Sequence, residues 1–251
     1  MNDSRLIHLV AHRGNAAEFP ENTVPAFRSA LELGVRFLEL DVQLARDGVP
    51  VVIHDHLLAR TTGQPGSVFD HDSAELVALS ACEPQRFDGR FRDVRLPLLS
   101  DVLRLLDGRP EVTVFVELKR ASLSQHGHDQ VVAQVLEALR PWRTQCVLIS
   151  FDLAAIHRAR QMGAAQIGWV LSDYDEHTRF KCEVLQPGFL FCNHEKLPAT
   201  GRLWSGPWRW AVYEVKELPL ALALAERGAD YLETMAVRAL SGALRAARTP
   251  P

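Results

Sequence analysis

The sequence predicts a (β/α)8 TIM barrel, an α/β fold in which eight parallel strands alternate with helices. Two observations favour this fold. Candidate strands and helices alternate through most of the chain, and one of the nine candidate strands is a short hairpin arm, which leaves eight for a parallel sheet. Polar or charged residues also follow most of the apolar strands, and the carboxyl ends of barrel strands are where functional sites are built.

The composition is that of an ordinary globular protein and excludes several classes of function. With 251 residues, of which 47% are hydrophobic and 24% charged, the chain is expected to fold as one domain spanning residues 1–251. The formal net charge of −3 gives no electrostatic reason to expect binding to nucleic acid or to an anionic membrane. The apolar runs are too short to cross a bilayer, so no integral membrane segment is expected.

Two features bear on the cellular compartment. The four cysteines show neither CxxC pairing nor the spacing of a zinc site, and we interpret them as reduced thiols. The N-terminus lacks the charged start, long apolar core and small-residue cleavage site of a signal peptide. Together these features predict a cytoplasmic protein. A monomer and a homodimer are both compatible with the sequence.

The first β/α unit follows from local patterns. Residues 6–10 form an apolar run that predicts a short buried strand. Asn22 or Thr23 can cap a helix over residues 24–33, which ends before a glycine. Positions 37, 39 and 41 hold one aromatic and two acidic residues, whereas positions 38, 40 and 42 are aliphatic, and this alternation predicts the second strand over residues 37–42.

The next segment departs from the β/α pattern. An Arg-Asp-Gly turn at residues 46–48 leads into a strand at 51–53, and this connection is too short for a crossover helix, so the strand is expected to be antiparallel. From residue 56 to 97 the periodicity is lost, apart from one short helix expected within 72–79. We interpret residues 56–97 as a small insertion within the barrel.

The remaining elements return to alternation. Ser100 is expected to cap a helix over residues 101–106, and residues 172–188 have no clear period. The expected strands are 112–117, 147–150, 166–171, 189–192, 209–213 and 230–234. The expected helices are 130–139, 153–162, 218–227 and 237–245, and the tail from residue 245 is expected to fray.

Two acidic residues share one face of the second strand. Side chains alternate along a strand, so Glu39 and Asp41 point the same way, about 7 Å apart. Two carboxylates aimed at one spot repel each other unless a positive charge lies between them, and hard divalent cations prefer oxygen ligands. Glu117 and Lys119 repeat this spacing on a later strand, so Glu117 would bring a third carboxylate to the cation.

Two histidines end strands in the same region. Imidazoles such as those of His12 and His54, with an ordinary pKa of about 6.5, can act as acid or base at neutral pH. Three carboxylates, one divalent cation, Arg13 and Lys119 leave about one positive charge, which suits a phosphodiester. Other residues expected at strand ends are Ser150, Phe151, Asn193, His194, Tyr213, Glu214, Glu233 and Thr234. The roles of Asn193, His194, Tyr213 and Glu233 stay open.

These residues belong to a longer pattern. It runs through His12-Arg13-Gly14, Pro20-Glu21-Asn22-Thr23, Glu39-Leu40-Asp41-Val42, Val51-Val52-Ile53-His54-Asp55, Arg60-Thr61-Thr62 and Glu117-Leu118-Lys119. In order and spacing the pattern closely resembles the glycerophosphodiester phosphodiesterase family over residues 6–120. Weaker similarity continues at residues 150–152, 210–212 and 228–234. A match in so many parts is highly specific, whereas His-Arg-Gly alone would be weak.

The resemblance implies a TIM barrel with a small insertion after the second histidine, and hydrolysis of a glycerophosphodiester to glycerol 3-phosphate and an alcohol. It implies one divalent cation, Mg²⁺ or Ca²⁺, bound by Glu39, Asp41 and Glu117. It also implies that His12 and His54 are the acid/base pair and that Arg13 and Lys119 bind phosphate. Attack by the neighbouring glycerol hydroxyl, giving a cyclic phosphate that water opens, is favoured, and direct attack by water stays open as the alternative. Which histidine is the acid stays open.

Some positions depart from the family's pattern or allow two interpretations. Tyr213 stands where the family often has asparagine, and Met235 stands where it often has aspartate. Both differences are expected to affect the preference for the leaving group and not the core chemistry. Trp210 is expected in the pocket wall, facing the glycerol carbons, with core packing as the alternative. Glu21 and Asn22 have either a capping role or a substrate role, and for Asn22 the structural role is favoured.

Two other functions compete with this interpretation. A phospholipase-D-like or cyclising phosphodiesterase on the same barrel would act on lysolipids and should expose an apolar rim. A catalytically silent phosphate-ligand binder would usually have lost a histidine or a metal carboxylate, and all five are present. The sequence therefore favours a metal-dependent hydrolase with a small-molecule glycerophosphodiester as its substrate.

Overall fold

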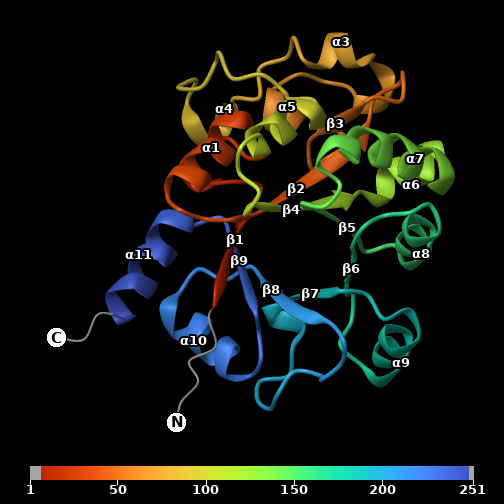
Figure 1. Ribbon diagram of the computed structural model, residues 1–251. Helices are drawn as coiled ribbons and strands as arrows, with labels where there is room; N and C mark the ends of the chain where they lie inside the picture. The colour runs from red at the N-terminus through yellow and green to blue at the C-terminus, as the bar shows by residue number, and fades with distance from the viewer. Residues whose placement is uncertain (1–6, 249–251) are drawn as a thin grey trace.

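Eight parallel strands form a closed barrel in the computed structural model, which describes residues 7–248 (Figure 1). Their order is β1-β9-β8-β7-β6-β5-β4-β2, and β1 pairs with β2 to close the ring. The strands are β1 (His8–His12), β2 (Phe37–Leu44), β4 (Thr113–Leu118), β5 (Cys146–Ser150), β6 (Ile167–Val170), β7 (Phe189–Asn193), β8 (Arg209–Tyr213) and β9 (Tyr231–Thr234). The predicted (β/α)8 fold is confirmed. Leu6, the predicted start of the first strand, lies outside the described residues.

The ninth strand is the predicted hairpin arm. β3 (Pro50–Val52) pairs antiparallel with the end of β2, with Val52 opposite Val42 and Pro50 opposite Leu44. Because the turn between the two strands is too short to contain a crossover helix, the two strands can pair only in the antiparallel direction.

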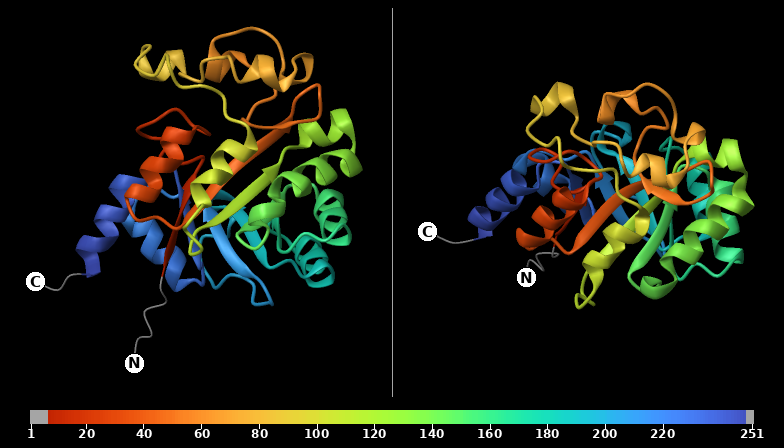
Figure 2. Two further views of the ribbon diagram at one scale, coloured as in Figure 1. Left: turned by 45° about the horizontal axis from the view of Figure 1, so that its top comes forward. Right: turned by 90° about the horizontal axis from the view of Figure 1, so that it is seen from above.

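Helices surround the barrel on its outside (Figure 2). They are α1 (Val24–Glu32), α5 (Leu99–Leu103), α6 (Arg120–His126), α7 (His128–Leu139), α8 (Leu153–Gln161), α9 (Glu176–Leu185), α10 (Leu218–Glu226) and α11 (Val237–Arg248). Short 3-10 turns lie at Arg104–Leu106, Arg140–Trp142 and His194–Lys196. Within the described residues, no helix is both long and apolar enough to cross a bilayer.

Two local predictions differ from the structure, and a segment without a predicted element contains a helix. The N-cap of α5 is Leu98 and not Ser100, and the carboxylate of Asp101 accepts the Leu98 N–H at 3.1 Å. Residues 172–188, which have no clear period, contain α9, whose N-cap is Asp175. The expected fraying from Arg245 is wrong for residues 245–248, because α11 continues through them.

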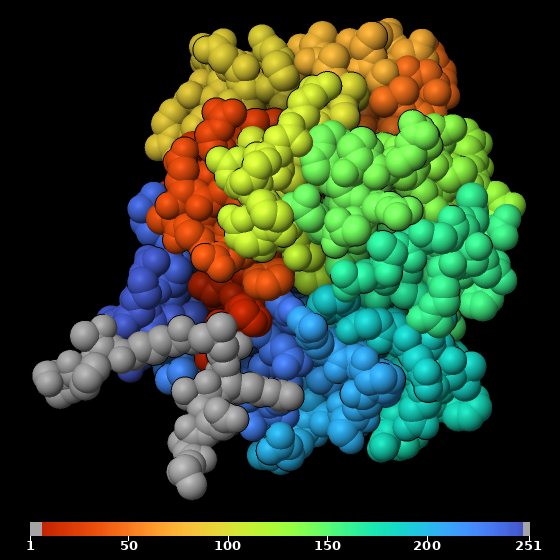
Figure 3. All heavy atoms as spheres, in the orientation of Figure 1, coloured from red at the N-terminus to blue at the C-terminus, as the bar shows by residue number. Residues whose placement is uncertain are grey.

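Residues 56–97 lie over the β2–β3 hairpin and α1, at the top of Figures 1 and 3. They contain the short helices α2 (Ala59–Thr62), α3 (Ser73–Leu76) and α4 (Pro84–Phe87), and a 3-10 turn at Val68–Asp70. Their apolar side chains pack with the hairpin in a separate cluster formed by Ala45, Val51, Ile53, Leu58, Val68, Leu76, Ala81 and Leu96.

The alternation of side chains along the strands divides the core in two and positions the site. Outward-facing residues such as Leu38 and Leu40 of β2 pack against the helices. Inward-facing aromatic residues, including Phe115 and Tyr231, fill the barrel, and Phe37 packs against them. Glu39 and Asp41 share the parity of Phe37 further along β2, so their carboxylates lie inside the barrel toward its carboxyl end.

Candidate active site

A cavity of about 160 Å³ lies at the carboxyl ends of the strands. Its charged wall comes from the ends of β1, β2, β4 and β9 and from the segment after β3: His12, Arg13, Glu39, His54, Glu117, Lys119 and Glu233. Its other wall comes from β5 to β8 and is mainly apolar: Ile149, Phe151, Val170, Phe191 and Tyr213. The cavity can therefore hold a small ligand with one charged end and one apolar side.

The turn after β1 fixes Arg13 by an unusual backbone path. Arg13 and Gly14 have φ values of 57° and 83°, both in the left-handed region. A Cβ on Gly14 would lie 2.7 Å from the carbonyl carbon of Ala26, so only glycine lets this turn pack against α1. The Arg13 N–H then donates to the Glu39 carboxylate at 3.1 Å. The backbone thus ties the β1 turn to the acidic residues of β2.

The three predicted carboxylates converge. Glu39, Asp41 and Glu117 are buried, and one oxygen from each lies within 4.8 Å of the others. Lys119 Nζ lies 2.8 Å from Glu117 Oε1 and 3.2 Å from Asp41 Oδ1. Arg13 Nε lies 3.2 Å from Asp41 Oδ2. The site therefore combines a carboxylate triad with two basic side chains.

Asn22 supports this triad. Its side-chain amide donates to Asp41 Oδ2 at 2.8 Å, and its side-chain oxygen accepts the Asp41 N–H at 3.3 Å. Thr23, and not Asn22, is the N-cap of α1, where its hydroxyl accepts the Ala26 N–H. Asn22 has a φ of 57°, a conformation that asparagine tolerates better than most residues.

The carboxylates differ in their electrostatic state. Burial raises the pKa of Glu39 well above its ordinary value, and the facing carboxylates of Asp41 and Glu233 raise it further. Burial also acts on Asp41, but Lys119 and Arg13 outweigh it and hold the pKa of that carboxyl well below its usual range. Burial raises the pKa of Glu117 despite the opposing effect of Lys119. Burial and the neighbouring carboxylates thus disfavour the charged forms of Glu39 and Glu117, whereas the basic side chains favour the charged form of Asp41.

The triad is chemically suited to a divalent cation. Its donors are buried carboxylate oxygens at the right spacing for a common ligand, which is the donor set that Mg²⁺ and Ca²⁺ prefer. The raised pKa of Glu39 reflects a need for positive charge that a cation would satisfy. The donor set alone does not distinguish between the two ions.

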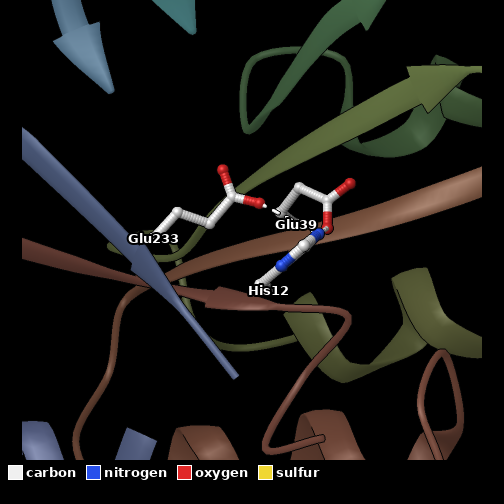
Figure 4. Close-up of side chains that lie close together, drawn as sticks. All are labelled: His12, Glu39 and Glu233. Atoms are coloured by element: carbon white, nitrogen blue, oxygen red, sulfur yellow. Dashed lines mark ion pairs between the residues drawn. The ribbon is translucent and has the colours of Figure 1, made fainter. Parts of the chain in front are cut away.

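His12 is surrounded by three carboxylates. Its Nδ1–H donates to Glu214 Oε2 at 2.6 Å, and its Nε2 lies 3.4 Å from Glu233 Oε1 and 3.9 Å from Glu39 Oε2. Figure 4 shows His12, Glu39 and Glu233 converging from β1, β2 and β9. Burial lowers the pKa of His12, but Glu233 and Glu214 outweigh burial and the pKa lies above its ordinary value. Burial raises the pKa of Glu233 to about 7.

His54 lies on the same cavity and also has a carboxylate partner. Its Nδ1–H donates to Asp55 Oδ1 at 2.6 Å. Arg60 of α2 donates to Asp55 Oδ2 at 2.5 Å and to both oxygens of Glu21 at 2.7 and 2.9 Å. Arg13 Nη1 donates to Glu21 Oε1 at 3.1 Å. An unbroken chain of hydrogen bonds therefore links His54 to Arg13 through Asp55, Arg60 and Glu21, and Arg60 lies in the middle of it.

The sequence-based charge balance was incomplete. Counting three carboxylates and two basic side chains omitted Glu214 and Glu233, which lie against His12. Both residues stood in the set expected at strand ends, but no motif signalled that they would meet His12. Counting these two carboxylates as charged lowers the balance from about +1 to about −1, and the positive charge of a protonated His12 would bring it to about zero.

Trp210 does not lie with the other predicted site residues. It is buried in the core between the barrel and the helices, and its indole N–H donates to the carbonyl of Trp204 at 2.9 Å. Its neighbours Ala211 and Val212 alternate, with Ala211 facing inward and Val212 outward, so Trp210 has the outward parity. The prediction that Trp210 forms part of the pocket wall is therefore wrong, and core packing, the alternative, holds.

The fold and site define a (β/α)8 barrel protein whose carboxyl-end cavity combines an acidic triad, two basic side chains and two histidines. The chain belongs to the glycerophosphoryl diester phosphodiesterase family, whose model matches residues 12–189.

Similar proteins agree with this assignment. A glycerophosphodiester phosphodiesterase of Caldanaerobacter subterraneus subsp. tengcongensis is 33% identical over 154 residues, which are 61% of this chain and 62% of the relative. One from Bacillus altitudinis is 39% identical over 129 residues, 51% of this chain and 52% of the relative. The matched segments thus span between half and two thirds of these relatives.

Solved structures share the fold at low sequence identity. An Oleispira antarctica phosphodiesterase in complex with the product sn-glycerol-3-phosphate has a TM-score of 0.83 and 23% identity, over 95% of this chain and 96% of that one. A glycerophosphodiester phosphodiesterase from Agrobacterium tumefaciens has a TM-score of 0.74 and 23% identity, over 94% of this chain and 100% of that one. Both similarities support the barrel.

Proposed function

We propose that this protein hydrolyses glycerophosphodiesters to glycerol 3-phosphate and an alcohol. The observation that carries the proposal is the convergence of a buried carboxylate triad, two basic side chains and two histidines on one small cavity. Family membership supports the same reaction. The cavity, at about 160 Å³, is smaller than the roughly 300–1,000 Å³ typical of drug-sized ligands, so it suits a glycerol phosphate group.

In this proposal, Arg13 and Lys119 bind the phosphate oxygens, and the apolar wall of β5 to β8 faces the carbon atoms of the substrate. His12 and His54 transfer protons to and from the reacting oxygens, since both line the cavity and each has its Nδ1–H held by a carboxylate. Glu39, Asp41 and Glu117 hold one divalent cation, Mg²⁺ or Ca²⁺. When bound, the cation supplies positive charge next to the phosphate.

The protein is further proposed to act as one domain over residues 1–251, in which residues 56–97 are an insertion. This segment contributes Arg60, which holds both Asp55 and Glu21. Through these two carboxylates it would fix the position of His54 and Arg13. The four cysteines are free and buried, in keeping with the cytoplasmic location that the sequence predicts.

The tryptophans weigh against a lysolipid substrate. A lysolipid enzyme needs an exposed apolar rim for the lipid tail, and Trp204, Trp208 and Trp210 are large apolar side chains in β8 and the segment that leads into it. Trp208 and Trp210 are buried, and the Trp204 ring stacks on Tyr174 with ring centroids 3.8 Å apart. These side chains are therefore occupied by packing within the protein.

The test is to identify the products. Purified protein is incubated with glycerophosphocholine, glycerophosphoethanolamine and lysophosphatidylcholine, each with Mg²⁺ or Ca²⁺, and phosphorus-containing products are resolved by ³¹P NMR. The proposal predicts glycerol 3-phosphate from the first two substrates and a much slower reaction of the third. Faster conversion of lysophosphatidylcholine, or a cyclic phosphate as the end product, would favour the lysolipid or cyclising alternative.

A further inference from the structure

Glu214 lies directly behind His12 as seen from the cavity. It follows β8, and its side chain is 19% exposed. His12, Glu39 and Glu233 line the cavity, whereas Glu214 is not among the lining residues. Glu214 therefore contacts the space available to a substrate only through the His12 ring.

Both carboxylate oxygens of Glu214 are held. Oε2 accepts the His12 Nδ1–H at 2.6 Å, and Oε1 accepts the backbone N–H of Met235 at 2.7 Å. Met235 directly follows β9, so the carboxylate is fixed between the ends of β8 and β9. A short hydrogen bond to a rigidly held carboxylate restrains both the position and the rotation of an imidazole ring.

The opposite side of the ring shows why this restraint matters. Nε2 faces Glu233 at 3.4 Å and Glu39 at 3.9 Å, and both of these side chains are buried. A turn of the ring by 180° about its Cβ–Cγ bond would exchange Nε2 with Cε1 and Nδ1 with Cδ2, and so take Nε2 away from these two carboxylates. Glu214 removes this alternative, because it occupies Nδ1 from the side away from the cavity.

We propose that Glu214 is a positioning residue for His12, which holds Nδ1–H and so keeps Nε2 directed into the cavity. Nδ1 carries a proton in this arrangement whether the ring is neutral or charged, and Nε2 is the atom that exchanges a proton with the substrate. His54 and Asp55 form the same kind of pair at 2.6 Å, but Asp55 is the next residue in the chain. Glu214 lies 202 residues from His12, so only the closed barrel brings the two together.

The proposal is tested with three glutamate variants and two readouts. Glu214→Gln removes the charge and leaves one oxygen where two are used, and Glu214→Asp keeps both oxygens on a shorter side chain. Glu217→Gln is the matched control, because Glu217 is exposed, lies three residues away and makes no side-chain capping bond to α10. The kinetic readout rests on the proposed function, and the spectroscopic readout does not.

The spectroscopic readout is the Nδ1 proton of His12. In protein labelled with ¹⁵N histidine, a hydrogen bond this short gives a downfield proton resonance, which is assigned by its absence from His12→Asn. The resonance should be lost in Glu214→Gln and kept in Glu217→Gln. It should also be kept in Glu233→Gln, which removes the carboxylate on the other side of the ring. A resonance that persists in Glu214→Gln, or is absent from the wild type, would overturn the proposal.

The kinetic readout is hydrolysis of glycerophosphocholine. Loss of a carboxylate behind a functional histidine costs about 10–100-fold, so kcat of Glu214→Gln should fall by about this factor while KM changes less than about threefold. Glu214→Asp should recover part of kcat. A kcat equal to that of Glu217→Gln would overturn the proposal.

The role of Glu214 can still be decided if the wild type is inactive or if Glu214→Gln does not fold. If the wild type hydrolyses no glycerophosphodiester, the proposed function fails, and the His12 resonance still decides the role of Glu214. If Glu214→Gln does not fold, the resonance is followed in Glu214→Asp. A shifted but protected signal would support the proposal, and an unshifted signal, identical to that of Glu217→Gln, would overturn it.

Discussion

Lys119→Met tests whether the basic side chains of the site stand in for a cation. Lys119 is 14% exposed, and its ammonium lies 2.8 Å from Glu117 and 3.2 Å from Asp41. Methionine keeps the apolar stem and removes the charge, so the variant leaves a triad of buried carboxylates with one basic side chain fewer. Removing one partner of a buried ion pair costs about 3–5 kcal/mol.

The lower end of this range applies in metal-free protein. The pKa of Glu117 is already raised by burial, so this carboxyl can take up a proton and relieve part of the repulsion. A loss of about 3 kcal/mol corresponds to a Tm about 6–12 °C lower for a protein of this size. A divalent cation on the triad replaces the missing charge, so Mg²⁺ or Ca²⁺ should raise the Tm of the variant more than that of the wild type.

The assay is thermal unfolding followed by circular dichroism, in EDTA and in each metal. Arg104→Gln serves as the control, because Arg104 and its partner Asp101 are 65% and 38% exposed, and an exposed pair contributes about 0–1 kcal/mol. A Lys119→Met protein that melts within about 2 °C of the wild type in EDTA would refute the reasoning, since this shift is below 1 kcal/mol. An equal response of both proteins to metal would refute the link to the cation.

Two further substitutions have predictable effects. Glu39→Gln should abolish turnover and yet raise the Tm of the metal-free protein. The reason is that burial and the facing carboxylates raise the pKa of Glu39, so its charged form destabilises the folded state at neutral pH. A Tm lower than that of the wild type in EDTA would contradict this. Burial raises the pKa of Glu21, but Arg60 and Arg13 outweigh burial and hold this pKa below the ordinary value of 4.5. The ion pairs of Glu21 therefore stabilise the fold above about pH 4.5, and this contribution is lost as the pH falls further. Arg60→Gln should therefore lower stability to urea at pH 7 more than at pH 3.5, and an equal loss at both values would contradict the role of this pair.

The parts of the site that the sequence predicts are those encoded by local spacing. Glu39 and Asp41 two residues apart on one strand must share a face, and the short turn after β2 must make a hairpin, so both follow from chain geometry. The pairing of Glu214 with His12 has no such local signal, because the two residues are brought together by closure of the barrel. Sequence motifs thus located the centre of the site and not its surroundings.

Trp210 and α9 show where the sequence pattern does not determine which side chains are buried. Trp210 lies next to the inward-facing Ala211, and a shift of one residue along a strand moves a side chain from the cavity to the outer core. Helix α9 lacks a clear apolar period because Phe180 and Val184 are 63% and 71% exposed, so apolar residues fall on both of its faces. In both places burial depends on partners that are distant in the sequence.

The central claim is tested most directly by measuring metal-dependent release of glycerol 3-phosphate. Wild-type protein and His54→Ala are assayed on glycerophosphocholine and glycerophosphoethanolamine with Mg²⁺, with Ca²⁺ and with EDTA, and circular dichroism confirms that both proteins are folded. The account predicts release that requires a divalent cation and is abolished in His54→Ala. Release that persists in EDTA, or at the wild-type rate in folded His54→Ala, would contradict it.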